Sequence, residues 1–171
     1  MASSTYFSDK ASMIDQIHLR TLELRTEHLF DMIVELQQPL VIGDTPKGNR
    51  QILLGNGGIF TGTRLRGDIL PGGADWYLTR PDGVGELDVR VTLRTHDHAT
   101  IYMRSEGFLH YPRKLAREVL SGNADPDDYY LRERTRFETA ADSYGWLNSI
   151  IGIGVGWYEP GSVGMSIYEI K

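Results

Sequence analysis

The segment from Glu86 to Arg94, with the sequence ELDVRVTLR, alternates strictly between polar and apolar residues. This period of two places successive side chains on opposite faces of a β-strand, so one face is apolar and the other is mostly charged. The charged face can point into water, or it can line a polar pocket if the strand forms the wall of a barrel. Periodicity alone favours water, because solvated strand faces are the commoner case.

Most of the chain after His28 shows comparable β-type patterns, separated by polar and glycine-containing turns. The short connectors PDG and THDH are typical of hairpins, which favours antiparallel pairing. One short surface helix is expected in YPRKLAREVLSGN, where Pro112 suits the first turn and Gly122 the C-terminal cap. The pattern predicts an all-β fold, a single antiparallel β-barrel of about eight to ten strands, with a two-sheet sandwich as the alternative. The last three strands are expected in residues 130–140, 144–159 and 162–170.

Length and composition point to one barrel domain with a polar extension. Residues 1–20 are rich in serine and lack strand periodicity, so we expect a flexible N-terminal arm followed by the barrel domain over residues 21–171. The net charge of −5, without a basic cluster, argues against nucleic acid as a partner. No secretory signal or apolar run of membrane-spanning length is recognised, so a cytoplasmic protein without a membrane partner is expected.

Motifs of well-known catalytic and metal sites are missing from the sequence. There is no cysteine, nucleophile elbow, HExxH motif or P-loop, so thiolate, hydrolase and kinase chemistry lacks support. His96 and His98 share a face at a hairpin tip but have no apparent third ligand, and we therefore expect neither a metal nor a cofactor. His110 could act as an acid or base, although a lone histidine is more often structural.

Glycine recurs at alternate positions in IIGIGVGW, at Gly152, Gly154 and Gly156. One face of that strand therefore carries no side chains. A phosphate-binding loop would need a turn and a following helix N-terminus, which this pattern lacks. We interpret the glycines as permitting strand curvature or the close approach of another element.

Four short motifs, LPGGADW, RPDGV, RFETA and YGWLN, resemble those of the DUF3237 family, also catalogued as UPF0311, in order and spacing. The resemblance covers roughly residues 26–171. It implies a small antiparallel β-barrel with a shape related to allene oxide cyclase and dirigent proteins. In such a barrel a polar strand face can line a cavity, but the family brings no established catalytic set.

The polar strand faces, interpreted as a cavity lining, supply the candidate site. Asp75, Asp88 and Glu138 are candidate general bases, and Arg132 joins them in the candidate catalytic group. The candidate substrate-binding residues would stack on a substrate or hold its oxygen atoms; they are Arg66, Trp76, Tyr102, Arg104, Trp146 and Asn148.

Two classes of function follow for this pocket, and a third does not need it. The first is a cofactor-independent enzyme of a biosynthetic pathway that cyclises, isomerises or adds to a hydrophobic, oxygenated small molecule. The second is a non-catalytic small-molecule-binding barrel. The third is a structural barrel whose Arg/Glu face forms a homodimer interface, and a homodimer is a further expectation in its own right.

Overall fold

The computed structural model describes residue 13 and residues 22–171 of the chain. Apart from Met13, the arm expected over residues 1–20 lies outside the described residues.

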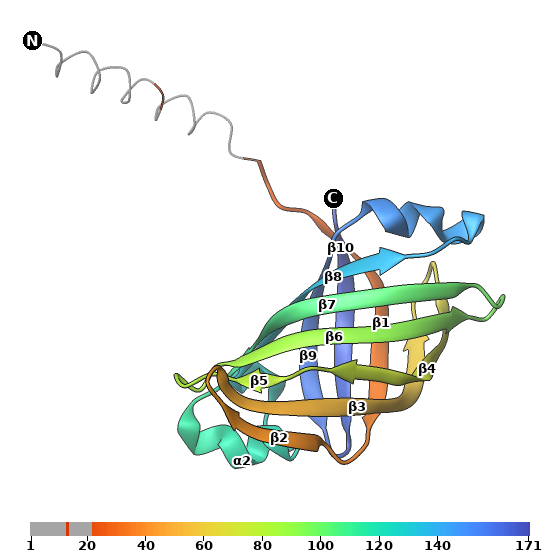
Figure 1. The fold of residues 1–171 in the computed structure, drawn as a ribbon. Coiled ribbons are helices and arrows are strands. Elements are labelled where there is room, and N and C mark those ends of the chain that lie inside the picture. The colour runs from red at the N-terminus through yellow and green to blue at the C-terminus, as the bar shows by residue number, and fades with distance from the viewer. Residues whose placement is uncertain (1–12, 14–21) are drawn as a thin grey trace, which may run out of the picture.

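Eight antiparallel strands close into a barrel (Figure 1). Each strand pairs with the next around the wall, and β3 pairs with β1 to complete the circle. Two short strands are added: β2 (Leu40–Thr45) pairs with β3, and β5 (Leu78–Thr79) pairs with β3 and β6. The predicted barrel is therefore confirmed, and closure excludes the sandwich. Around the wall the strands are β1 (Thr26–Leu36), β10 (Ser162–Ile170), β9 (Gly152–Glu159), β8 (Tyr130–Glu138), β7 (Thr100–His110), β6 (Gly85–Thr95), β4 (Arg66–Asp75) and β3 (Gly48–Thr61).

Short helical segments lie at the two ends of the barrel. At one end, η1 (Arg113–Leu115) leads into α2 (Ala116–Leu120), and η2 (Pro126–Asp128) follows. The predicted surface helix thus exists in a shorter form, and Gly122 ends it with φ +74°, a conformation suited to glycine. We call this end the mouth, and Figure 1 shows it at the lower left.

The opposite end carries η3 (Asp142–Ser149), a 3₁₀ helix where the sequence predicted part of a strand. The prediction was wrong because Tyr144 and Leu147, three residues apart, are both buried, which matches the three residues per turn of a 3₁₀ helix. The Asn148 side chain also accepts from the Thr139 N–H and donates to the Thr139 carbonyl, each at 2.9 Å. These contacts hold the segment as a cap on the barrel.

The capped end is filled by side chains, whereas the mouth end is partly hollow. Phe30 lies with its ring centroid 5.4 Å from that of Phe60 and 6.1 Å from that of Phe137. Closer to the mouth on β9, a Cβ atom at Gly156 would lie 2.7 Å from the Leu131 side chain, so this glycine permits close packing there. Closer to the mouth the interior contains a cavity.

Candidate functional site

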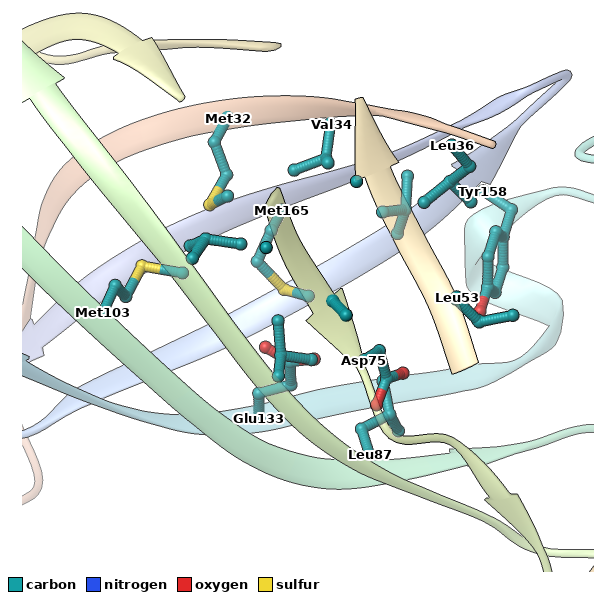
Figure 2. Close-up of a pocket in the computed structure, with 16 residues that line it drawn as sticks. Met32, Val34, Leu36, Leu53, Asp75, Leu87, Met103, Glu133, Tyr158 and Met165 are labelled. Atoms are coloured by element: carbon teal, nitrogen blue, oxygen red, sulfur yellow. The ribbon is translucent and has the colours of Figure 1, made fainter. Parts of the chain in front are cut away.

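The cavity lies inside the barrel wall and has a volume of about 60 Å³, room for a few water molecules. Most of its lining is aliphatic or methionine, but two carboxyl groups, Asp75 and Glu133, also face it (Figure 2). Among the described residues that line it, none is cationic. The labelled apolar side chains around the two acids in Figure 2 are Met32, Val34, Leu36, Leu53, Leu87, Met103 and Met165.

Glu133 reaches the interior through the regular alternation of β8. Leu131, Glu133, Thr135 and Phe137 share one parity and are all buried, and only 6% of Glu133 is exposed. The arginines of β8 have the opposite parity and are exposed or half-buried. Glu133 therefore places a carboxyl group on the buried, inward-facing side of β8.

Asp75 reaches the interior through an irregularity in β4. Between the pairs Leu70–Thr92 and Ala74–Arg90, β4 has two more residues than β6. Gly72 lies in this bulge with φ +100°, a left-handed conformation that favours glycine. After the bulge, Asp75 faces the cavity with 8% of its surface exposed.

Burial changes the acidity of both carboxyl groups. It raises the pKa of Asp75 to about 7, although the Asp88 N–H that donates to its Oδ1 at 2.9 Å acts in the opposite direction. Desolvation likewise raises the pKa of Glu133 to about 8, and the charge of Asp75 adds to this effect. A hydrogen bond with Ser105 partly lowers it. Two interacting acids thus titrate near neutral pH inside an apolar cavity.

A buried hydroxyl pair stands beside Glu133. Ser105 on β7 and Thr135 on β8 are register partners, and their hydroxyl oxygens lie 2.8 Å apart. Both residues are fully buried. The pair holds the Ser105 hydroxyl at the Glu133 carboxyl group.

Tyrosines surround the junction between the cavity and the mouth. The Tyr158 side chain lines the cavity, and its backbone N–H donates to the Tyr129 hydroxyl at 2.8 Å. Burial raises the pKa of Tyr158 well above its ordinary value, and burial also raises the pKa of Tyr77 to about 12. These phenols remain neutral hydrogen-bonding groups across the physiological pH range.

A wider hollow opens outward from the cavity at the mouth, and we call it the vestibule. It has a volume of about 470 Å³ and shares Leu36, Leu53 and Tyr158 with the cavity. The vestibule therefore borders the cavity on the mouth side. Its other lining residues are Gln37, Gln38, Pro39, Gln51, Tyr77, Thr79, Tyr111, Leu120, Glu159, Gly161 and Ser162.

The charged face of β6 lies outside the barrel, whereas its apolar residues Leu87, Val89 and Val91 line the cavity. Asp88 lies on the outer wall, with its carboxylate 3.1 Å from the Arg90 guanidinium and 3.5 Å from that of Arg104. The expectation that this polar face lines the cavity is thereby corrected. The homodimer inferred from the arginine-rich faces stays a prediction.

The other sequence-based candidates also lie on the outside of the barrel. Arg132 is half-buried and lies over the Tyr130 ring at 5.3 Å, while Trp76 is exposed with Arg90 at 4.8 Å from its ring. Arg66 is exposed. The Arg64 guanidinium lies over the Trp146 ring of η3, 3.5 Å from the ring centroid. A surface groove near the capped end brings together four candidates, Tyr102, Arg104, Glu138 and Asn148. Of the predicted site residues, the structure places Asp75 in the cavity.

Sequence reasoning missed Glu133 and Tyr158. A signal for Glu133 was available, because it shares the parity of Leu131 and Phe137 in YLRERTRFE and is thus an acid on the apolar face of its strand. Tyr158 likewise shares the parity of the β9 glycines.

The histidines do not form a cluster in the described part of the chain. His96 and His98 are exposed at the β6–β7 turn, where His98 has φ +68°. His110 is exposed and stacks on Tyr130 with ring centroids 4.8 Å apart. Over residues 13 and 22–171, no group of three side chains suited to a metal ion is found. Within the same residues, no helix is long and apolar enough to cross a membrane.

Comparison with known proteins places the chain in a family. The profile of the family described as "Protein of unknown function (DUF3237)" matches residues 24–170. The chain belongs to the DUF3237 family. A UPF0311 protein of Clostridium acetobutylicum, CA_C3321, is 33% identical over 151 residues, which cover 87% of this chain and 96% of that protein. The resemblance inferred from the motifs is confirmed.

Solved structures of other proteins agree with the fold. The structure of RPA1785 from Rhodopseudomonas palustris matches with a TM-score of 0.84 at 28% identity. The match covers 88% of this chain and 100% of the RPA1785 chain. A β-barrel-like protein from Acinetobacter baumannii matches with a TM-score of 0.78 at 30% identity, covering 89% and 99%. An enzyme from Penicillium herquei has a TM-score of 0.69 at 19% identity, covering 89% and 98%, a likeness of fold alone.

Proposed function

We propose that this DUF3237 protein is a cofactor-independent acid–base enzyme that isomerises or cyclises a hydrophobic, oxygenated small molecule in the barrel. The observation that carries the proposal is the pair of buried acids, Asp75 and Glu133, in an otherwise apolar cavity. In the described part of the chain no cationic side chain lines the cavity, and the charge of Arg50, outside the lining, only partly offsets the effect of burial on the pKa of Asp75. Buried carboxyl groups that are not fully compensated destabilise a fold when they ionise, so their presence favours a functional role. The solved Penicillium herquei protein is described as an enzyme, which supports catalysis in a barrel of this shape.

The different acidities of the two groups suggest their roles. Between pH 7 and 8 the pair holds about one proton, with Asp75 as the stronger acid and Glu133 as the weaker. The Asp88 N–H, which donates to Asp75 Oδ1 at 2.9 Å, stabilises the ionised form of Asp75, so Asp75 acts as the general base and Glu133 as the general acid. The Ser105 hydroxyl orients the Glu133 carboxyl group for donation.

The proposed step balances without a redox change. The Asp75 carboxylate removes a proton from a C–H next to a carbonyl group, or from a hydroxyl group of the substrate. Glu133 donates its proton to the atom that gains electron density, so substrate and product have the same composition. Proton transfer from Asp75 to Glu133 through solvent then restores the pair. The Tyr158 hydroxyl, neutral at this pH, is available to donate to a substrate oxygen at the rim of the cavity.

A Kemp elimination tests for an activated base without knowledge of the natural substrate. In 5-nitrobenzisoxazole a base removes the ring C–H proton, the N–O bond breaks, and a coloured cyanonitrophenolate forms. We expect the protein to catalyse this reaction with a rate that rises through about pH 7, and we expect Asp75→Asn to abolish it. Asp142→Asn, which replaces an exposed acid of η3 at the capped end, serves as the control and should retain the rate.

Two results would contradict the proposal. One is a rate no faster than that of free acetate at equal concentration, and the other is an unchanged rate in Asp75→Asn. Binding of small molecules without any such proton transfer would favour the alternative of a non-catalytic binding barrel.

A further inference from the structure

We propose that the vestibule is a binding subsite for the uncharged, hydroxyl-bearing body of a ligand whose apolar end enters the cavity. This inference rests on the proposed function for the chemistry at the inner end of the ligand, but the recognition itself depends on other residues. It narrows the substrate class to neutral, amphipathic molecules.

The relative sizes of the two hollows require a ligand with two parts. The cavity of about 60 Å³ accepts only a small end group, whereas the vestibule offers about 470 Å³. Leu36, Leu53 and Tyr158 line both hollows, so one ligand can extend from one into the other. The larger part of any ligand that reaches Asp75 must therefore lie in the vestibule.

The chemistry of the vestibule favours uncharged oxygen and nitrogen groups. Gln38, Gln51, Thr79 and Ser162 supply side-chain amides and hydroxyls, each of which both donates and accepts hydrogen bonds. The Gln51 amide is held only weakly, by a donor–acceptor distance of 3.4 Å to Asn49, and can turn to a ligand. Its backbone N–H donates to the Tyr77 carbonyl at 2.9 Å, which fixes the residue at the mouth.

The charges around the two hollows act against an anionic ligand. Among the described residues that line the vestibule none is cationic, and Glu159 is acidic. Glu159 already accepts from the Trp157 indole N–H at 3.0 Å, so it is partly satisfied. Asp75 and Glu133 add negative charge at the inner end above neutral pH. A carboxylate or phosphate would be repelled, while a polyol or a sugar would meet matching hydrogen-bonding groups.

Three probes that share an ethyl group, small enough for the cavity, test the inference by isothermal titration calorimetry or ligand-observed NMR. They are ethyl β-D-glucopyranoside, which is neutral, ethyl phosphate, which is anionic, and ethyltrimethylammonium, which is cationic. At pH 7.5 we expect the glucoside to bind at least tenfold more tightly than the phosphate, which the acidic groups repel, and we expect the ammonium ion to bind no more tightly than the glucoside because it cannot use the amides and hydroxyls of the vestibule. Gln51→Leu should weaken binding of the glucoside about fivefold, the effect of one neutral hydrogen bond, while Asp142→Asn, at an exposed position of η3 at the capped end, leaves it unchanged.

The outcomes separate this inference from the proposed function. The double variant Asp75→Asn/Glu133→Gln should lose Kemp activity but keep its preference for the glucoside. If wild type shows the preference without Kemp activity, the acid–base proposal fails and the vestibule inference stands. If the phosphate binds as tightly as the glucoside, if the ammonium ion binds more tightly than the glucoside, or if Gln51→Leu has no effect on the glucoside, the vestibule inference is overturned whatever the catalytic result.

Discussion

Replacing Glu133 with glutamine should make the protein more stable at high pH. In the fold the Glu133 pKa is raised from 4.5 to about 8, chiefly because burial penalises the charged form. Between these two values the folded state binds more protons than the unfolded state, so the free energy of unfolding falls as the pH rises. The loss begins near pH 4.5 and is complete above pH 8. Glutamine does not ionise, so the Glu133→Gln variant avoids this loss of stability.

The size of the effect follows from the same two pKa values. Each pKa unit corresponds to about 1.4 kcal/mol, so ionising Glu133 in the fold costs about 5 kcal/mol. Water that enters the cavity reduces this cost, and we expect Glu133→Gln to gain about 3 to 5 kcal/mol over wild type at pH 9. At pH 5 both side chains are neutral and similar in shape, so the two proteins should agree within about 1 kcal/mol.

Urea unfolding at pH 5, 7 and 9, followed by tryptophan fluorescence, measures the difference. Glu138→Gln is the matched control, since Glu138 lies on the same strand but is exposed, and it should follow the wild-type pH dependence. The reasoning is refuted if Glu133→Gln and wild type lose stability in parallel between pH 5 and 9. It is also refuted if the variant is less stable than wild type by the same amount at every pH.

Three further predictions concern the rest of the chain. Gly156→Ala should destabilise the protein by about 1 to 3 kcal/mol, because the added Cβ atom would crowd the Leu131 side chain. Gly145→Ala should have no effect on stability, since no atom lies within 4 Å of the added carbon. Thermal unfolding of the two variants and wild type measures the difference. Dialysis against EDTA should leave the melting temperature unchanged, and a marked fall would point to a metal at His96 and His98. Limited proteolysis should remove residues 1–20 and leave a resistant barrel, and protection of that segment would contradict the expected arm.

The barrel itself was predictable because several of its strands alternate regularly between apolar and polar residues. The alternation from Glu86 to Arg94 defines a strand with one apolar face, and the tight PDG and THDH turns allow only antiparallel neighbours. Residues 142–149 were harder to predict. Their apolar residues are compatible with a strand, and the contacts of Asn148 with Thr139 become visible only in the folded chain.

The candidate site was less predictable, because periodicity separates two faces of a strand without saying which one points inward. Ranking residues by polarity therefore selected Asp88, which lies outside. Asking which acid shares the face of buried leucine and phenylalanine would have selected Glu133. The orientation of Asp75 depends on the two additional residues of β4 near Gly72, whose number emerges only from the pairing register.

The most direct test of the buried acid pair is a ¹³C NMR titration of the side-chain carboxyl carbons, assigned with Asp75→Asn and Glu133→Gln. Our account predicts that Asp75 titrates at about pH 7 and Glu133 at about pH 8. It also predicts that Asp75→Asn lowers the titration midpoint of Glu133, because the charge of Asp75 contributes to raising it. Midpoints near pH 4 for both groups would contradict the account, since they would place the two carboxyl groups in water.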